Sequence, residues 1–156
     1  MVKRDYQIEA RRKHKLASAR MANQRASLKY SVELMREIKG MRLERALQFM
    51  RNILEHKEHI PLKKYVRKMP HRKGRAVSGT KTGKYAHGTV EIFITLLESV
   101  KANADYKGMD GKNLIITHAF ASQGFARASY QKQGRIAGKR RKRKSAHLEI
   151  FAREMK

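Results

Sequence analysis

The sequence has no cysteine, few acidic residues and no long apolar run, and each of these shortages excludes a class of protein. Without cysteine, neither disulfide bonds nor thiolate metal sites can stabilise the fold, and a reducing compartment is permitted. No apolar run approaches the roughly 18 residues of a membrane-spanning helix, and the opening residues MVKRDYQIEA lack the apolar core of a signal peptide. We therefore expect a soluble intracellular protein, whose 156 residues suffice for one domain with an additional extension.

The shortage of acidic residues is uneven along the chain. Only 13 Asp and Glu stand against 38 Lys and Arg, which gives a formal net charge of +25. The acids cluster within 33–58 and 91–110, whereas 10–32, 59–90 and 111–148 contain none. Charge-balanced segments flanked by purely basic blocks are typical of a folded body with separate phosphate-binding surfaces. Such a protein requires a polyanionic partner.

Three segments have the apolar spacing of amphipathic helices. The first is predicted over about 32–39, with Ser31 as its N-cap and Gly40 in the left-handed position beyond its end. The second covers 43–54 and the third 86–104, because apolar residues recur in both at intervals of three and four.

Two segments have the composition of strands, and a third is a weaker candidate. The residues LIITHAFA at 114–121 are rich in β-branched types, and AHLEIFA at 146–152 alternates in polarity. The weaker candidate is ASLKY at 26–30. We predict an α+β fold in which a small three-stranded antiparallel sheet packs against three helices.

The connection at 122–145 has no acidic residue and no proline. Composition alone favours a disordered basic loop, whereas the strands at both ends favour a projecting β-hairpin that turns around 131–138. Arms of about 13 residues at about 3.3 Å each would reach roughly 40 Å. An unsupported ribbon is marginal in water, and like charges two residues apart repel by about 0.6 kcal/mol. We therefore expect the hairpin to be mobile alone and to become ordered on a polyanion.

Two motifs invite a catalytic interpretation that their spacing does not support. GTKTGKY at 79–85 has three residues between its glycines where a phosphate loop needs four, and Tyr85 replaces the required Ser or Thr. Lys84 could still meet a phosphate of the polyanionic partner together with the first N–H groups of the third helix, or the segment is a plain loop. His56 and His59 are spaced three apart, unlike a metalloprotease pair, so surface histidines are the simpler interpretation. We predict no enzyme, no metal and no cofactor.

Three stretches of the chain, taken in order, carry a resemblance to a known protein family. They are SARMANQRASLKYSVELMREIKGMRLERALQFM (18–50), ANADYKGMDGKNLIITHAF (102–120) and SYQKQGRIAGKRRKRKSAHLEI (129–150). The family is that of the large-ribosomal-subunit proteins of universal family twenty-two, called seventeen in older eukaryotic naming. The archaeal and eukaryotic branch is most similar, because IPLKKY at 60–65 precedes a long basic insertion.

The resemblance implies a structural constituent of the cytoplasmic large subunit, with a single domain at 18–156 after a basic extension at 1–17 that orders on RNA. A hairpin at about 119–147 would line the peptide exit tunnel. The implied partners are large-subunit ribosomal RNA, neighbouring large-subunit proteins and the nascent peptide near the hairpin tip, with no membrane and no small-molecule substrate.

The resemblance also assigns RNA contacts to Tyr130 and Arg135, and a turn or close approach to Gly134. Tyr130 either stacks on a base or stands idle on the ribbon. The outgoing arm carries one Arg and the return arm carries the run KRRKRK, so the phosphate contacts are expected mostly on the return arm. The predicted rRNA-binding residues are Arg20, Arg25, Lys63, Lys64, Arg67, Arg72, Lys73, Arg75, Lys84, Arg127, Tyr130, Lys132, Arg135, Lys139, Arg140, Arg141, Lys142, Arg143 and Lys144.

Two other functions remain open from the residues. A DNA-compacting chromosomal protein would need the same positive charge, and it predicts similar affinity for duplex DNA and folded RNA. An RNA-modifying enzyme would need a catalytic constellation, which the sequence does not display.

Overall fold

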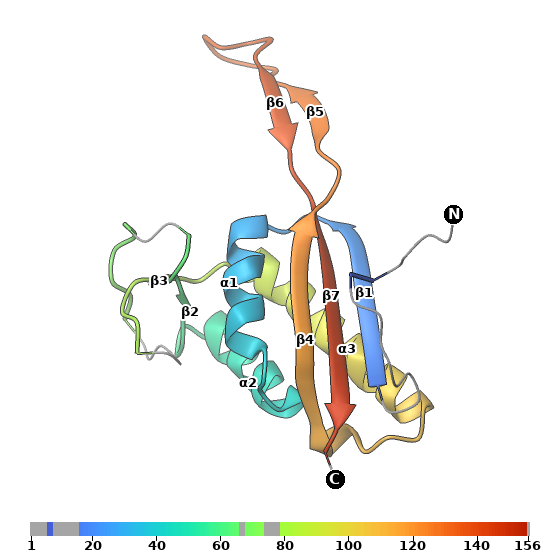
Figure 1. Cartoon of the computed structure of the whole chain (residues 1–156). Helices are drawn as coiled ribbons and strands as arrows, with labels where there is room; N and C mark the ends of the chain where they lie inside the picture. Colours follow the sequence, from blue (N-terminus) through green and yellow to red (C-terminus); the bar gives the residue numbers. More distant parts are fainter. Residues whose placement is uncertain (1–5, 8–15, 66–67, 74–78, 156) are drawn as a thin grey trace, which may run out of the picture.

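The computed structural model describes residues 6–7, 16–65, 68–73 and 79–155. Its centre is an antiparallel sheet with the strand order β1-β7-β4. The strands are β1 (Leu16–Gln24), β4 (Leu114–Gln123) and β7 (Ala146–Glu154). Helices cover one face of this sheet, and a narrow ribbon projects from one end of it (Figure 1). The predicted α+β fold class is confirmed.

Three helices form close to the predicted segments. They are α1 (Leu28–Ile38), α2 (Leu43–Leu54) and α3 (His87–Tyr106). The predictions for α2 and α3 were accurate because both helices bury one apolar stripe, and such a stripe is visible in the sequence. Within the described ranges, none of the helices is long and apolar enough to cross a membrane.

The start of α1 differs from the prediction. The helix begins at Leu28 with Ser27 as its N-cap, and Ser31 lies one turn inside it, so the prediction of Ser31 as N-cap is wrong. The Ser31 N–H donates to the Ser27 carbonyl at 2.8 Å. Two serines one turn apart offer alternative starts, and the packing of Leu28 against the core favours the earlier one. Gly40 has a φ of 87°, which confirms its predicted left-handed position.

The third strand of the sheet is not the predicted one. Residues 28–30 form the first turn of α1, so the prediction of a strand at 26–30 is wrong. The strand is instead β1, which begins at Leu16, two residues before the predicted domain boundary. Its buried positions include Ala17 and Ala19, whose small side chains let α3 pack closely against the strand. Small residues carry little hydrophobic signal, which explains why the pattern was missed.

The core lies between the helices and the sheet. It includes buried residues of the strands that lead into the projecting ribbon. Leu148 and Ile150 of β7 are fully buried, together with Phe49 of α2 and Phe93 of α3. Burying a side chain of this size stabilises the fold by about 1.5–3 kcal/mol. The strands that run into the ribbon are therefore firmly fixed in the body.

The projecting ribbon is a β-hairpin, as predicted. Its strands β5 (Arg127–Tyr130) and β6 (Arg140–Arg143) pair antiparallel. At the turn, the Gly138 N–H donates to the Gln131 carbonyl at 2.8 Å, and Gly134 has a φ of 86°. Backbone bonds thus close the turn within the predicted range 131–138.

A small second unit lies beside the helices, away from the hairpin (Figure 1). Its strands β2 (Ile60–Pro61) and β3 (Gly83–Lys84) pair antiparallel. This pairing brings together the two ends of the long basic insertion between α2 and α3. A short 3-10 helix, η2 (Gly111–Asn113), precedes β4.

Candidate nucleic-acid interface

The hairpin concentrates positive charge on a narrow, exposed support. Between residues 124 and 145 there are nine basic residues and no acidic one. All nine side chains are exposed. They are Arg127, Lys132, Arg135, Lys139, Arg140, Arg141, Lys142, Arg143 and Lys144. Within the described parts of the chain, no carboxylate forms an ion pair with any of them.

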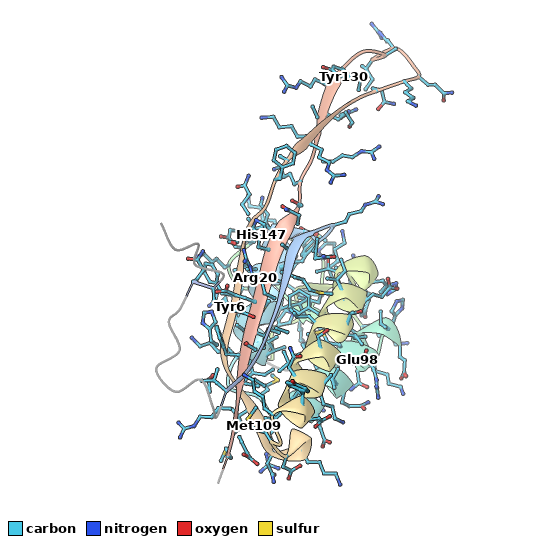
Figure 2. All side chains as sticks on the ribbon, turned by 90° about the vertical axis from the view of Figure 1, so that its right-hand side faces the viewer. Tyr6, Arg20, Glu98, Met109, Tyr130 and His147 are labelled. Carbon is cyan, nitrogen blue, oxygen red and sulfur yellow. The ribbon has the colours of Figure 1, made fainter. Side chains whose placement is uncertain are left out.

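In the hairpin, an arginine and a tyrosine of the outgoing arm lie opposite arginines of the return arm. Arg127 lies opposite Arg143, and Tyr130 lies opposite Arg140. Like charges directly opposite each other destabilise a strand pair. Tyr130 is 66% exposed and lies toward the far end of the ribbon (Figure 2), so its ring is accessible to a base. This geometry is compatible with the predicted stacking of a base on Tyr130.

The strands of the hairpin do not simply continue those of the sheet. Gln123 pairs with Ala146, and pairing resumes with Arg127 opposite Arg143. Three residues on the outgoing arm (124–126) therefore face two on the return arm (144–145). One extra residue is a β-bulge, which turns the ribbon and exchanges the faces of the following strand.

A set of hydrogen bonds holds this bulge in place. We call Asn23, Gly124, Phe125 and Ser145 the hairpin junction. The Asn23 Oδ1 accepts from the Phe125 N–H at 2.9 Å and from the Ser145 hydroxyl at 3.3 Å. The Ser145 hydroxyl lies 2.6 Å from the Phe125 carbonyl, and the Gly124 N–H donates to the Ser145 carbonyl at 2.9 Å. The end of β1 is thus hydrogen-bonded to both arms of the hairpin at its base.

Two junction residues are suited to this place by their backbones. Asn23 has a φ of 52°, a conformation that asparagine tolerates better than most residues. A Cβ on Gly124 would lie 2.5 Å from the Ser145 Oγ and 2.8 Å from the Asn23 Oδ1, so only glycine fits without a shift. Sequence reasoning did not identify Asn23, because its role depends on a pairing of distant segments.

Two concave surfaces border the hairpin junction. One has a volume of about 570 Å³ and is lined by three junction residues, Asn23, Phe125 and Ser145, together with Arg25, Arg127, Arg143 and Lys144. The other, of about 460 Å³, lies beside the start of α1 and is lined partly by Arg25, Lys142 and Lys144. The structure thus brings Arg25, which comes from the β1–α1 connection, to the cations at the base of the hairpin.

A second group of predicted residues lies on the insertion between α2 and α3. The Glu33 carboxylate accepts from the Lys64 N–H at 2.7 Å and from the Tyr65 N–H at 2.6 Å. Lys63 forms an ion pair with Glu37 at 2.8 Å. Two acids of α1 therefore position the beginning of the insertion, which explains them without acid–base catalysis.

The rest of that group is fixed by local contacts. The Arg72 Nε donates to the Gly83 carbonyl at 3.3 Å, and the Lys73 carbonyl accepts from the Tyr85 hydroxyl. Lys84 lies on β3, ahead of the start of α3. Its Nζ is 5.3 Å from the centre of the Tyr30 ring. Arg67 and Arg75 lie outside the described residues. Arg20 is exposed on β1, where it faces Glu149 of β7.

The histidines serve structural contacts. His56 and His87 approach each other through their Nε2 atoms at 2.8 Å, and the His59 Nε2 lies 2.9 Å from the Thr80 carbonyl. In the described part of the chain, no group of three potential ligands is placed to hold a metal ion. His56 and His59 thus contact different partners. His56 is exposed, as predicted, whereas His59 is buried, so the prediction of a surface histidine is wrong for His59.

One face of the body differs from all these basic surfaces. Glu91, Glu98 and Asp105 recur at seven-residue intervals along the exposed side of α3. Glu98 points outward from this helix, on the body and far from the hairpin tip (Figure 2). This acidic stripe would repel RNA phosphates.

Comparison with known proteins gives one consistent result. Residues 19–153 match the family described as ribosomal protein L22p/L17e. A large ribosomal subunit protein uL22 from Methanococcus aeolicus is 29% identical over 99% of both chains. Proteins of the same name from Archaeoglobus fulgidus and Methanopyrus kandleri are 32% and 35% identical, over 80% and 69% of this chain and 79% and 67% of their own.

Proposed function

This chain belongs to the ribosomal protein L22p/L17e family and is a structural constituent of the large ribosomal subunit, in which we propose that its basic hairpin binds ribosomal RNA and lines the peptide exit tunnel. The observation that carries the proposal is the anchored hairpin. Its arms hold nine cations and no acid, while the adjoining strands are fixed in the core by Leu148 and Ile150.

The proposed mechanism is neutralisation of phosphates and recognition of RNA shape. Each phosphate neutralised by Lys or Arg releases condensed counterions, which favours binding at physiological salt. A-form RNA hides base edges in a deep major groove, so a ribbon of cations reads backbone geometry more readily than sequence. A flexible tail could supply the same charge, but a fixed hairpin determines which RNA segments the charge contacts.

The distribution of charge suggests how the protein is oriented. The hairpin and the basic insertion would face RNA, and the acidic stripe on α3 would face solvent or a neighbouring ribosomal protein. The hairpin tip, which includes Arg135, would lie near the nascent peptide. We place the protein in the cytoplasm as part of the assembled large subunit.

Sedimentation tests the proposal. The native protein should travel with large subunits at a salt concentration that preserves them, and its recovery in the free fraction would contradict the proposal. A competition between duplex DNA and folded ribosomal RNA at physiological salt addresses the alternative of a DNA-compacting protein. Equal affinity would favour that alternative. Turnover on an RNA substrate by the purified chain would contradict a purely structural role.

A further inference from the structure

Phe125 presents an exposed aromatic ring at the base of the hairpin. Its side chain is 68% exposed, although its backbone is held by hydrogen bonds to Asn23 and Ser145. In the described residues, no other ring stacks on it. A fixed backbone with an unused ring is the arrangement expected of a stacking platform, because little conformational freedom is lost on binding.

The cations around this ring need an anion. Arg127 and Arg143 are cross-strand neighbours, and Arg25 and Lys144 line the same cavity. By contrast, Arg45 on the body has an acidic partner, Glu58, at 3.4 Å. Among the residues that line the cavity at the junction, none is acidic. A phosphate between the two arginines would replace their repulsion by two charge-assisted contacts.

The cavity has the size of a small-ligand site. Its volume of about 570 Å³ lies within the range of about 300–1,000 Å³ that is usual for such pockets. A single nucleotide combines the two chemical groups that the site can take, a flat base and a phosphate. Bases become available for stacking where RNA is single-stranded, in loops and bulges.

We infer that the hairpin junction holds one unstacked nucleotide of the RNA, with its base on the Phe125 ring and its phosphate between Arg127 and Arg143. This inference rests on the proposed RNA-binding function and names the element of RNA that the base of the hairpin recognises. Gly124 contributes by allowing the bulge, and Asn23 by holding the backbone of Phe125. The hairpin is thereby locked to the RNA at its base as well as along its arms.

Short RNA probes and the full-length protein test the inference. The probes are a tetranucleotide of adenosines and the matching ribose-phosphate oligomer without bases. All proteins carry Tyr130→Leu, so that stacking at the tip does not contribute. On this background, the adenosine tetranucleotide should bind about tenfold more tightly than the baseless oligomer, a value within the range for one stacked base.

Substitutions at Phe125 then locate the stacked base. Phe125→Leu should abolish the tenfold preference, and Phe125→Tyr should retain it. Tyr106→Leu is the matched control, because Tyr106 is 92% exposed at the end of α3 and should not affect the preference. Arg127→Gln with Arg143→Gln should weaken both probes equally. Unchanged thermal unfolding of each variant would show that the fold is intact.

Three results would overturn the inference. If the preference for the adenosine tetranucleotide survives Phe125→Leu, the base is stacked elsewhere. If the protein that carries only Tyr130→Leu binds the two probes equally, phosphates alone are bound. An acidic peptide that displaces the tetranucleotide at lower concentration than RNA does would assign the cavity to a protein partner and contradict the inference. Sedimentation distinguishes a failure of the proposed function from a failure of this inference. If the proposed function is wrong, the protein will be recovered in the free fraction and not with large subunits, whatever its preference for the probe with bases.

Discussion

Two antiparallel strand pairs, one in the body and one in the hairpin, differ in what stabilises them. In the body, β4 and β7 pair over a buried core, and Leu148 and Ile150 are inaccessible to solvent. Beyond the junction, β5 and β6 pair with no core beneath them, and their basic side chains are exposed. The body provides stability without ligand, and the hairpin provides charge that only a polyanion can neutralise. The fold thus separates the part that positions the hairpin from the part that we propose binds RNA.

Truncating the buried part should produce the largest loss of stability. Leu148→Ala creates a cavity beneath the sheet and should lower the free energy of unfolding by about 2–5 kcal/mol. The matched truncation in the hairpin is Ile136→Ala, because Ile136 is 46% exposed at the tip. That variant should change stability by at most about 0.5 kcal/mol. Urea unfolding measures both, and equal losses would remove the distinction between the two parts.

Removing charge from the hairpin should lower RNA affinity and leave the stability of the fold nearly unchanged. Arg140→Gln, Arg141→Gln and Arg143→Gln together should leave stability nearly unchanged. Each lost phosphate contact lowers the salt slope of RNA binding by about 0.7–0.9, so three should reduce affinity roughly 100-fold at about 0.15 M salt. Filter binding over a salt series would measure both quantities.

The control for the charge substitutions carries the same reduction in charge on the body. It combines Arg36→Gln, Lys101→Gln and Lys112→Gln. Its RNA affinity should fall much less than that of the hairpin variant. Equal losses in the two variants would mean that net charge, and not its placement on the hairpin, governs binding.

Adding a methyl group at the junction should have a smaller effect on RNA affinity, and it tests whether the body sets the direction of the hairpin. Gly124→Ala places a Cβ 2.5 Å from the Ser145 Oγ, so the bulge must shift at a cost of about 1–3 kcal/mol. We expect a several-fold loss of RNA affinity, because the hairpin is reoriented. Ser145→Ala should partly rescue the variant by removing that contact.

Gly88→Ala is the matched control for the junction substitution. A Cβ on Gly88 would have no neighbour within 4 Å, so RNA affinity should not change. Loss of affinity in this control equal to that in Gly124→Ala would contradict a specific role for the junction.

The parts that could be predicted from the sequence are those with a local signal. The stripe at 43–54 and the alternation at 146–152 each report burial of one face, so α2 and β7 appear near their predicted positions. The hairpin turn followed from an acid-free connection between two strands. For β1 the same reasoning failed, since alanine at buried positions reports packing against α3 only once the fold is known.

The candidate site divides in the same way. Its charge was visible in composition, and the assignment of RNA as the polyanion came from the family resemblance. The junction was not visible, because Asn23 and Ser145 are 122 residues apart and their contact depends on the register of three strands. The exposure of Phe125 likewise follows from the bulge and not from its neighbours in sequence.

Amide hydrogen exchange of the full-length protein, free and bound to large-subunit ribosomal RNA, tests the central claim most directly. In the free protein, amides of 124–145 should exchange rapidly and those of α3 slowly, because only the body has a core. With RNA bound, the hairpin amides should become protected while α3 changes little. Strong protection of the whole hairpin without RNA, or no gain of protection with it, would contradict the claim that the body positions a hairpin which RNA completes.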